Sequence, residues 1–255
     1  QPLRDAEPLK AAVDTVVSAH PYLKARLAVV DGEVVLQRRD EDSFEIFVTG
    51  PVRLSSAPGT SFFQALVRPF DLFGKPLCRF GIYTYEDCAY LFCDIHHIIT
   101  DGLSNGRLVA DILKVYNGDT VEPETFTAFD RALEEQENKR TEAYAQAAGY
   151  YKELLSGLES TVYPHSSSAS GQGRAGYVRQ TLPGAAISGH CSRLGVTVSN
   201  YVLTVFMEVL RRMSGEDRVL ITVIDSGREH AAMQDIQGFF VKTLPVVSAD
   251  TVAEV

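Results

Sequence analysis

Apolar and polar positions along this chain follow helical spacing in some stretches and strand spacing in others. Apolar residues recur at every third or fourth position across 5–19, which predicts an amphipathic helix. Two apolar runs, 27–30 and 34–36, flank the pair Asp31–Gly32, which strongly favours a β-hairpin turn. The chain therefore begins with a helix followed by paired strands.

The middle of the chain predicts more elements of both kinds. A strand at 44–48 and a helical turn at 61–67 precede two strands at 78–84 and 89–97, which are joined by an acidic turn. A helix follows the second of these strands and ends near residue 117. The next predicted element is a single long, Ala-rich and charged helix at about 127–156.

The last part of the chain alternates in the same way. It predicts a strand, two helices and two strands, at 177–182, 185–194, 198–213, 218–224 and 239–247. The second of these helices is expected to turn one apolar stripe inward, formed by Val202, Val205, Phe206, Val209, Leu210 and Met213.

A Ser- and Gly-rich stretch at 164–176 predicts a linker between two lobes. We therefore expect an N-terminal lobe at 1–163 and the start of a truncated C-terminal lobe at 177–255. Because both parts mix helices with strands, the predicted fold class is α/β, as an α/β sandwich built twice.

Composition narrows the function classes. The chain has 255 residues, of which 45% are hydrophobic and 22% are charged, with a formal net charge of −9. The excess of acid argues against a nucleic-acid-binding surface, which needs clustered basic residues. No apolar stretch reaches the roughly eighteen residues of a membrane span. The four cysteines form no C-x-x-C pair and predict reduced thiols in a cytoplasmic protein.

The strongest candidate for chemistry is the heptad at 96–102, which reads HHIITDG and follows an apolar strand. Burying such polar groups without partners costs about 2–7 kcal/mol, so they are either hydrogen-bonded or used in a reaction. A histidine with a free ring nitrogen is the common general base near neutral pH. No G-x-S-x-G elbow supplies a nucleophile, so the expected reaction uses a nucleophile that the substrate brings. Structural roles are expected for the other histidines: His20, His165, His190 and His230.

The expected geometry of the heptad follows from strand alternation. His97 should share one strand face with Cys93, and His96 should point to the other face. Asp101 lies one loop further on and could orient a ring or pair with a cation. Gly102 is expected to permit a backbone angle or a close approach that a Cβ would block. No metal is expected, since Cys93, His97 and Asp101 lack a recognised ligand spacing.

The heptad resembles HHxxxDG, the signature of the condensation domains of nonribosomal peptide synthetases. The wider superfamily of these domains includes chloramphenicol acetyltransferase. Three further segments stand in the family's order: 20–27 resembles RHxxLRTxF, 68–80 resembles PFDL…PLxR, and 227–245 resembles GR…GxFVNTLP. The resemblance covers nearly the whole chain.

This resemblance implies two chloramphenicol acetyltransferase-like lobes with a tunnel between them, the second lobe being incomplete here. A donor acyl or peptidyl thioester and an aminoacyl acceptor meet in the tunnel, and the acceptor amine attacks the donor carbonyl to form an amide. Both substrates are carried on phosphopantetheine arms, so the implied partners are upstream and downstream peptidyl carrier proteins and neighbouring synthetase domains in the same polypeptide. No bound cofactor, nucleic acid or membrane is implied.

The implied catalytic motif consists of His96, His97, Asp101 and Gly102. His97 would face the tunnel, either as a general base or as a group that positions the amine. Asp101 would be structural and would pair with a cation of the segment 20–27. Lys24 stands where the family has its arginine, and Arg26 follows two residues later, so both are candidate partners.

Two other functions stay open. One is a free-standing acyltransferase that uses CoA or carrier thioesters with the same base. The other is a non-catalytic relative that docks a carrier protein. Such relatives usually lose the second histidine or the glycine of the motif, and this chain keeps both.

Overall fold

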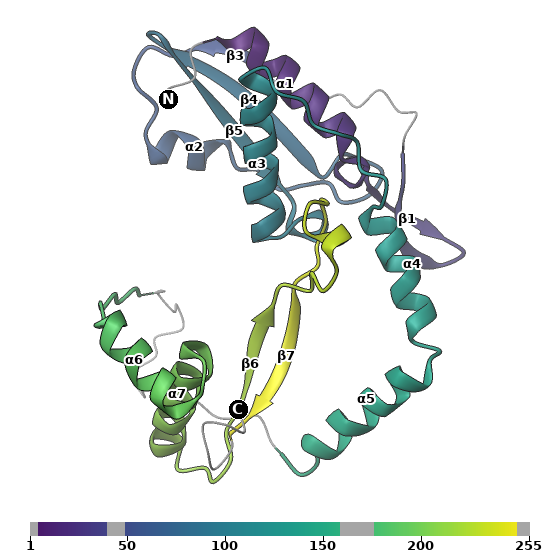
Figure 1. Cartoon of the computed structure of the whole chain (residues 1–255). Helices are drawn as coiled ribbons and strands as arrows, with labels where there is room; N and C mark the ends of the chain where they lie inside the picture. The colour runs from purple at the N-terminus through teal and green to yellow at the C-terminus, as the bar shows by residue number, and fades with distance from the viewer. Residues whose placement is uncertain (1–4, 40–48, 159–175, 249–255) are drawn as a thin grey trace, which may run out of the picture. The chain divides into compact units, whose positions relative to one another are not determined.

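The computed structural model describes residues 5–39, 49–158 and 176–248 (Figure 1). By its contacts the chain divides into two units. Unit 1 comprises Gln1–Arg140 and Ser226–Val241, and unit 2 comprises Thr141–Asp225 and Lys242–Val255. Each unit is described by itself below.

Unit 1 is built on a sheet of three strands in the order β3-β4-β5. These strands are β3 (Thr49–Arg53), β4 (Cys78–Tyr85) and β5 (Cys88–Ile95). β3 runs parallel to β4, and β4 pairs with β5 in an antiparallel register from Cys78 opposite Ile95 to Tyr85 opposite Cys88. The strands predicted at 78–84 and 89–97 are therefore present, but the second ends before the two histidines.

One face of this sheet carries the core of unit 1. α1 (Ala6–Ala19) and α3 (Gly102–Tyr116) lie side by side over that face (Figure 1). Their apolar residues recur at helical spacing, so each helix turns one stripe towards the sheet. The fully buried side chains include Leu9, Val13, Val16, Phe80, Ile82, Leu108 and Ile112.

Smaller elements complete this part of unit 1. The predicted hairpin is confirmed as β1 (Arg26–Val30) and β2 (Glu33–Gln37), with φ of 51° at Asp31 and 85° at Gly32, as a two-residue hairpin turn requires. A 3-10 turn, η1 (Pro21–Lys24), connects α1 to this hairpin.

The other face of the sheet is lined by aromatic rings. α2 (Thr60–Leu66) lies against it, since the ring of Phe62 contacts Tyr83 and the ring of Phe63 stacks on Phe92. This helix confirms the turn predicted at 61–67.

The long helix predicted at about 127–156 is wrong, because the chain forms two helices instead. They are α4 (Ala128–Asn138) and α5 (Glu142–Leu154). Thr141 has an extended backbone between them, and its hydroxyl accepts the N–H of Tyr144, so it starts a new helix as an N-cap. The division between the two units falls at this break.

Unit 2 contains α5, two further helices and a hairpin. The helices are α6 (Gly184–Leu194) and α7 (Val198–Ser214), and the hairpin pairs β6 (Leu220–Asp225) with β7 (Lys242–Val247). The bounds of α6, α7, β6 and β7 agree with the sequence predictions to within a few residues. Their small core is formed by Met207, Leu210, Val219 and Ile221, with Leu203 and Val246 packed against it.

The predicted inward face of α7 is wrong. Leu210 is buried as expected, but the stripe that packs on the hairpin runs through Leu203, Met207 and Leu210. The other residues of the predicted stripe are exposed: Val202, Val205, Phe206, Val209 and Met213. The helical spacing in this segment correctly predicts a helix. The spacing does not show which of the apolar residues on the helix pack against another element.

Other expectations also differ from the structure. Residues 177–182 form no strand, because none of the described strands pairs with them, and Tyr177 and Val178 are almost fully exposed. The strand predicted at 44–48 and nearly all of the linker predicted at 164–176 lie outside the described residues.

The division by contacts falls at other positions than the predicted lobes 1–163 and 177–255, which stay a prediction. The connection between β6 and β7, Ser226–Val241, belongs to unit 1, because its polar groups bond to α3 and to the loop before α4. A short 3-10 turn, η3 (Ala231–Met233), lies within this segment.

The four cysteines Cys78, Cys88, Cys93 and Cys191 are free, as predicted. Among the described helices, none has by itself the length and apolar composition to cross a membrane, although α6 and α7 pass that test together across a 95° bend.

The core of unit 1 gives a direct stability test. Leu108 is buried in α3, whereas Leu113 on the same helix is exposed. We expect Leu108→Ala to lower the free energy of unfolding by about 2–5 kcal/mol, since it removes buried methyl groups and leaves a cavity. Leu113→Ala, the same change at the surface, should cost less than about 0.5 kcal/mol. Urea unfolding of both variants checks this, and equal losses would contradict the described orientation of α3.

Candidate active site

The heptad at 96–102 forms the connection between β5 and α3. β5 ends at Ile95, and the N–H of His96 donates to the carbonyl of Leu77 at 2.8 Å as the chain leaves the sheet. A 3-10 turn, η2 (His97–Ile99), follows. The expectation that His97 continues the strand and shares a face with Cys93 is therefore wrong, because strand alternation stops at this turn.

His96 builds the turn with its own ring. Its Nδ1 accepts the N–H of Ile98 at 3.2 Å, so in the neutral ring the proton resides on Nε2. The rings of His96 and Phe70 form a T-shaped pair with a centroid distance of 5.7 Å. The guanidinium of Arg79 lies 4.1 Å from the Phe70 ring centroid and donates to Asp94 at 2.6 Å. Through these contacts the ring of His96 packs against Phe70 and stabilises the turn.

His97 differs from His96 in being exposed. Within the described part of the chain, its imidazole nitrogens have no hydrogen-bond partner, and the ring's neighbour is Phe239, at a centroid distance of 5.4 Å and an interplanar angle of 75°. Both nitrogens are therefore open to a substrate. Of the two histidines in the motif, His97 is the exposed one, and its ring makes no hydrogen bond to the described residues.

Asp101 is fully buried and caps α3. One carboxylate oxygen accepts the N–H of Ser104 at 2.8 Å, and the other accepts the N–H of Phe240 at 3.0 Å. Burial by itself raises the pKa of Asp101, but the hydrogen bonds from Ser104 and Phe240 and the charge of Arg228 outweigh it and hold the pKa below its usual value. The residue is thus a buried carboxylate that joins α3 to the segment 226–241.

The cation beside Asp101 is Arg228, with 3.6 Å between Nη2 and the carboxylate. Nη2 also donates to the hydroxyl of Ser104 at 2.6 Å, and Nη1 donates to the carbonyls of Met233 and Ile236. The guanidinium lies 4.6 Å from the ring centroid of Phe240. Arg228 therefore organises the whole segment 226–241 as well as compensating the buried charge.

Ser104 fixes the peptide of Gly238. Its hydroxyl donates to the Gly238 carbonyl at 2.7 Å and accepts the Gly238 N–H at 3.2 Å. A Cβ at position 238 would lie 2.5 Å from the ring of Phe240 and 2.8 Å from the Cβ of Ala128, so only glycine fits. Gly227 has a φ of 65°, and a Cβ there would lie 1.9 Å from the carbonyl oxygen of Phe240.

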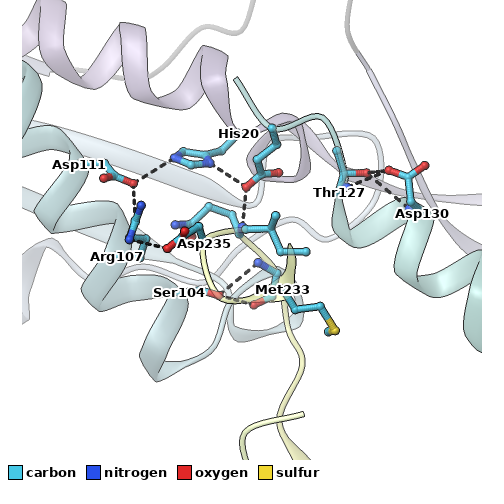
Figure 2. Close-up of polar contacts among 12 residues, drawn as sticks. His20, Ser104, Arg107, Asp111, Thr127, Asp130, Met233 and Asp235 are labelled. Carbon is cyan, nitrogen blue, oxygen red and sulfur yellow. Dashed lines mark hydrogen bonds and ion pairs between the residues drawn. The ribbon is translucent and has the colours of Figure 1, made fainter. Parts of the chain in front are cut away.

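A second polar network lies further along α3, around His20 (Figure 2). Nδ1 of His20 lies 2.7 Å from a carboxylate oxygen of Glu124, and Nε2 lies 3.5 Å from Asp111. Arg107 bridges Asp111 at 3.0 Å and Asp235 at 2.6 Å, so this network also joins α3 to the segment 226–241 (Figure 2). The arrangement fits the structural role expected of His20.

A family model described as the condensation domain matches residues 3–253. The chain belongs to the condensation domain family. Its α/β fold is that of condensation domains, as the sequence predicted.

Two curated relatives are peptide synthases. The domain is 27% identical to tyrocidine synthase 3 of Brevibacillus parabrevis over 92% of this chain and 4% of that protein. It is 26% identical to surfactin synthase subunit 1 of Bacillus subtilis (strain 168) over 94% of this chain and 7% of that protein. The chain therefore spans only a small part of the curated relatives it matches.

Solved structures share the fold at lower identity. The condensation domain of the monacolin K polyketide synthase superposes with a TM-score of 0.76 and 18% identity, over 97% of this chain and 60% of that chain. The epimerization domain of the third module of tyrocidine synthetase B gives a TM-score of 0.79 and 18% identity, over 95% and 60%.

Two expectations about the motif of this condensation domain need correction. Arg228, not Lys24 or Arg26, stands beside Asp101; one guanidinium nitrogen of Arg26 donates instead to the carbonyl of Gly74 at 3.1 Å. Gly102 was expected to avoid a steric block, but its φ is not positive and a Cβ there would meet nothing within 4 Å. No steric reason for this glycine exists in the described structure.

Cys93, His97 and Asp101, whose spacing did not favour a metal site, do not come together as metal ligands. Among the described residues, no three side chains of the His, Cys, Asp and Glu types gather in a way that could hold a metal ion. Burial raises the pKa of the Cys93 thiol to about 12, so it stays protonated at neutral pH.

Sequence reasoning missed Ser104 and the contact between His97 and Phe239. Arg228 lies in the segment 227–245, which resembles the family's GR…GxFVNTLP segment, so the sequence did point to this residue. Nothing in that pattern states that Arg228 folds back onto the heptad.

The buried carboxylate predicts a pH dependence of stability. Because its pKa is lowered on folding, Asp101 stabilises the domain fully above its unfolded pKa of about 3.9, and this contribution is lost as the pH falls through the lower folded value. We expect Asp101→Asn to lower the free energy of unfolding by about 3–5 kcal/mol at pH 7, since it leaves Arg228 buried without its counter-ion.

The difference between wild type and Asp101→Asn should shrink as the pH drops below about 4, because the wild-type carboxyl is then protonated too. Urea unfolding between pH 3 and pH 7 measures both values. Asp14→Asn, which breaks the exposed pair with Lys10, serves as the control and should cost less than about 1 kcal/mol. A difference that is independent of pH would show that the charge of Asp101 is not what stabilises the fold.

Proposed function

We propose that this domain forms an amide bond between two carrier-bound substrates. The observation that supports it best is the exposed imidazole of His97, whose nitrogens are not engaged by the described residues of the domain. The donor is an acyl or peptidyl thioester and the acceptor is an aminoacyl thioester with a free amine. Each is carried on the phosphopantetheine arm of a carrier protein, the donor upstream and the acceptor downstream.

In the proposed reaction, the acceptor nitrogen attacks the thioester carbonyl and forms the C–N bond. The tetrahedral adduct then collapses, the C–S bond breaks, and the donor phosphopantetheine leaves as a thiolate. Where His97 acts as a general base, it accepts the proton lost by the attacking nitrogen and returns it to the leaving sulfur, so no external acid or base is consumed.

His97 acts either as a full general base or by orienting the amine. An α-amino group has an ordinary pKa of about 7.7–8.0, so much of it is already neutral near pH 7.5 and needs little activation. Orientation alone is a large contribution to rate in intramolecular reactions. Both roles need the same open ring nitrogen, and both are included in the proposal.

Partners and location follow from this proposal. Two curated relatives are named as synthases of the peptides tyrocidine and surfactin, which favours a peptide as product. We propose that neighbouring synthetase domains deliver the two carrier proteins, and that the reaction takes place in the cytoplasm. The phosphopantetheine belongs to the carriers, so the domain itself needs no bound cofactor.

The test is amide formation in a single turnover with loaded donor and acceptor carriers. We expect His97→Ala to lower the rate by about 10²–10⁴-fold, the usual contribution of a general acid–base group. His230→Ala, the same change at an exposed histidine of unit 1, is the control and should leave the rate unchanged. Both variants should keep the wild-type thermal unfolding midpoint. Unchanged amide formation in His97→Ala would remove this residue from the mechanism.

The same assay separates the other candidate functions. Product from carrier-bound donors but not from CoA thioesters supports the proposal, whereas turnover of CoA thioesters supports a free-standing acyltransferase. Carrier binding without any product indicates a docking domain. Because an epimerization domain shares this fold, chiral analysis of the acceptor also shows whether its configuration changes.

A further inference from the structure

Phe239 lies between two residues whose backbones are held by buried groups. On one side, the N–H and carbonyl of Gly238 both bond to the hydroxyl of Ser104. On the other side, the N–H of Phe240 donates to Asp101. The backbone of Phe239 therefore has little freedom, and its position relative to the heptad is set by the motif carboxylate and by Ser104.

The two neighbouring phenylalanines have different surroundings. Phe240 is 8% exposed and packs in the core beneath Arg228, whereas Phe239 is 46% exposed and its ring contacts the imidazole of His97. A large apolar side chain that stays half in solvent contributes little to the core. The position of Phe239 is therefore better explained by what it does to His97 than by stability.

His97 needs something to orient it. A histidine that acts as a base is usually held by a hydrogen bond from its second ring nitrogen to a carboxylate or carbonyl. Within the described residues, no such bond is made to His97. An edge-to-face contact with an aromatic ring restricts the rotation of the imidazole without occupying either nitrogen.

We propose that Phe239 is a positioning residue that holds the imidazole of His97 in the orientation needed for amide formation. This inference rests on the proposed function. It also gives Asp101 and Ser104 an indirect part in the reaction, because they place the backbone of Phe239.

The first measurement does not depend on turnover. In NMR spectra of the full chain with isotope-labelled histidine, the ring current of Phe239 should shift the resonances of the His97 ring protons away from their values in a free histidine. His97→Gln identifies the signal by removing it. We expect Phe239→Ala to move the His97 signal towards that of a free histidine, and Phe239→Tyr to leave it close to the wild-type position.

The second measurement is the single-turnover rate of the same variants. We expect Phe239→Ala to slow amide formation by about tenfold or more, because small misplacements of a reacting group carry penalties of that size. Apparent affinity for the loaded carriers should stay unchanged, and Phe239→Tyr should restore the rate. Phe73→Ala is the matched control, since Phe73 is a 49% exposed phenylalanine of the same unit.

The outcomes are distinct. A slow Phe239→Ala with a shifted His97 signal, a normal rate in Phe73→Ala and rescue by tyrosine supports the inference. A shifted His97 signal with an unchanged rate in Phe239→Ala overturns the inference and leaves the proposed function intact. An equal loss of rate in Phe239→Ala and Phe73→Ala has the same meaning. If the wild-type chain forms no amide, the proposed function fails instead, and an unchanged His97 signal in Phe239→Ala overturns the contact itself.

Discussion

The site depends on one buried charge. Asp101 is fully buried, and it is stable there because two backbone N–H groups and Arg228 compensate the carboxylate. These partners come from the start of α3 and from residues more than a hundred positions later in the chain. The carboxylate can be satisfied only when these two distant segments meet, so it fixes one arrangement of the chain around His97.

The same interaction separates the roles of the motif residues. His96 forms the turn through its own Nδ1, and Asp101 joins the turn to the segment 226–241. His97 is thereby left as the exposed member, with its nitrogens open and its ring against Phe239. Within the motif, the side chains of His96 and Asp101 thus stabilise the turn that exposes His97. Mutations of these three residues therefore need separate interpretations.

Local pattern predicted local structure well. The spacing of Leu9, Val13 and Val16 predicted α1, and the pair Asp31–Gly32 predicted the first hairpin. Both patterns depend only on residues that are close in sequence. The heptad itself was found because buried polar residues are costly. By contrast, the break at Thr141, the packed face of α7 and the partner of Asp101 depend on contacts between distant segments, and sequence spacing contains no information about which segments meet.

The course of the chain between β6 and β7 affects how the domain can be taken apart. The hairpin connection leaves unit 2 after Asp225, enters unit 1 and returns at Lys242, so together with the passage at Thr141 the backbone crosses between the units three times. A single proteolytic cut at any one crossing leaves the other two intact. The cut nevertheless divides the linear chain into two fragments, which stay together through non-covalent contacts, namely those of Ser226–Val241 with the rest of unit 1 or the pairing of β6 with β7.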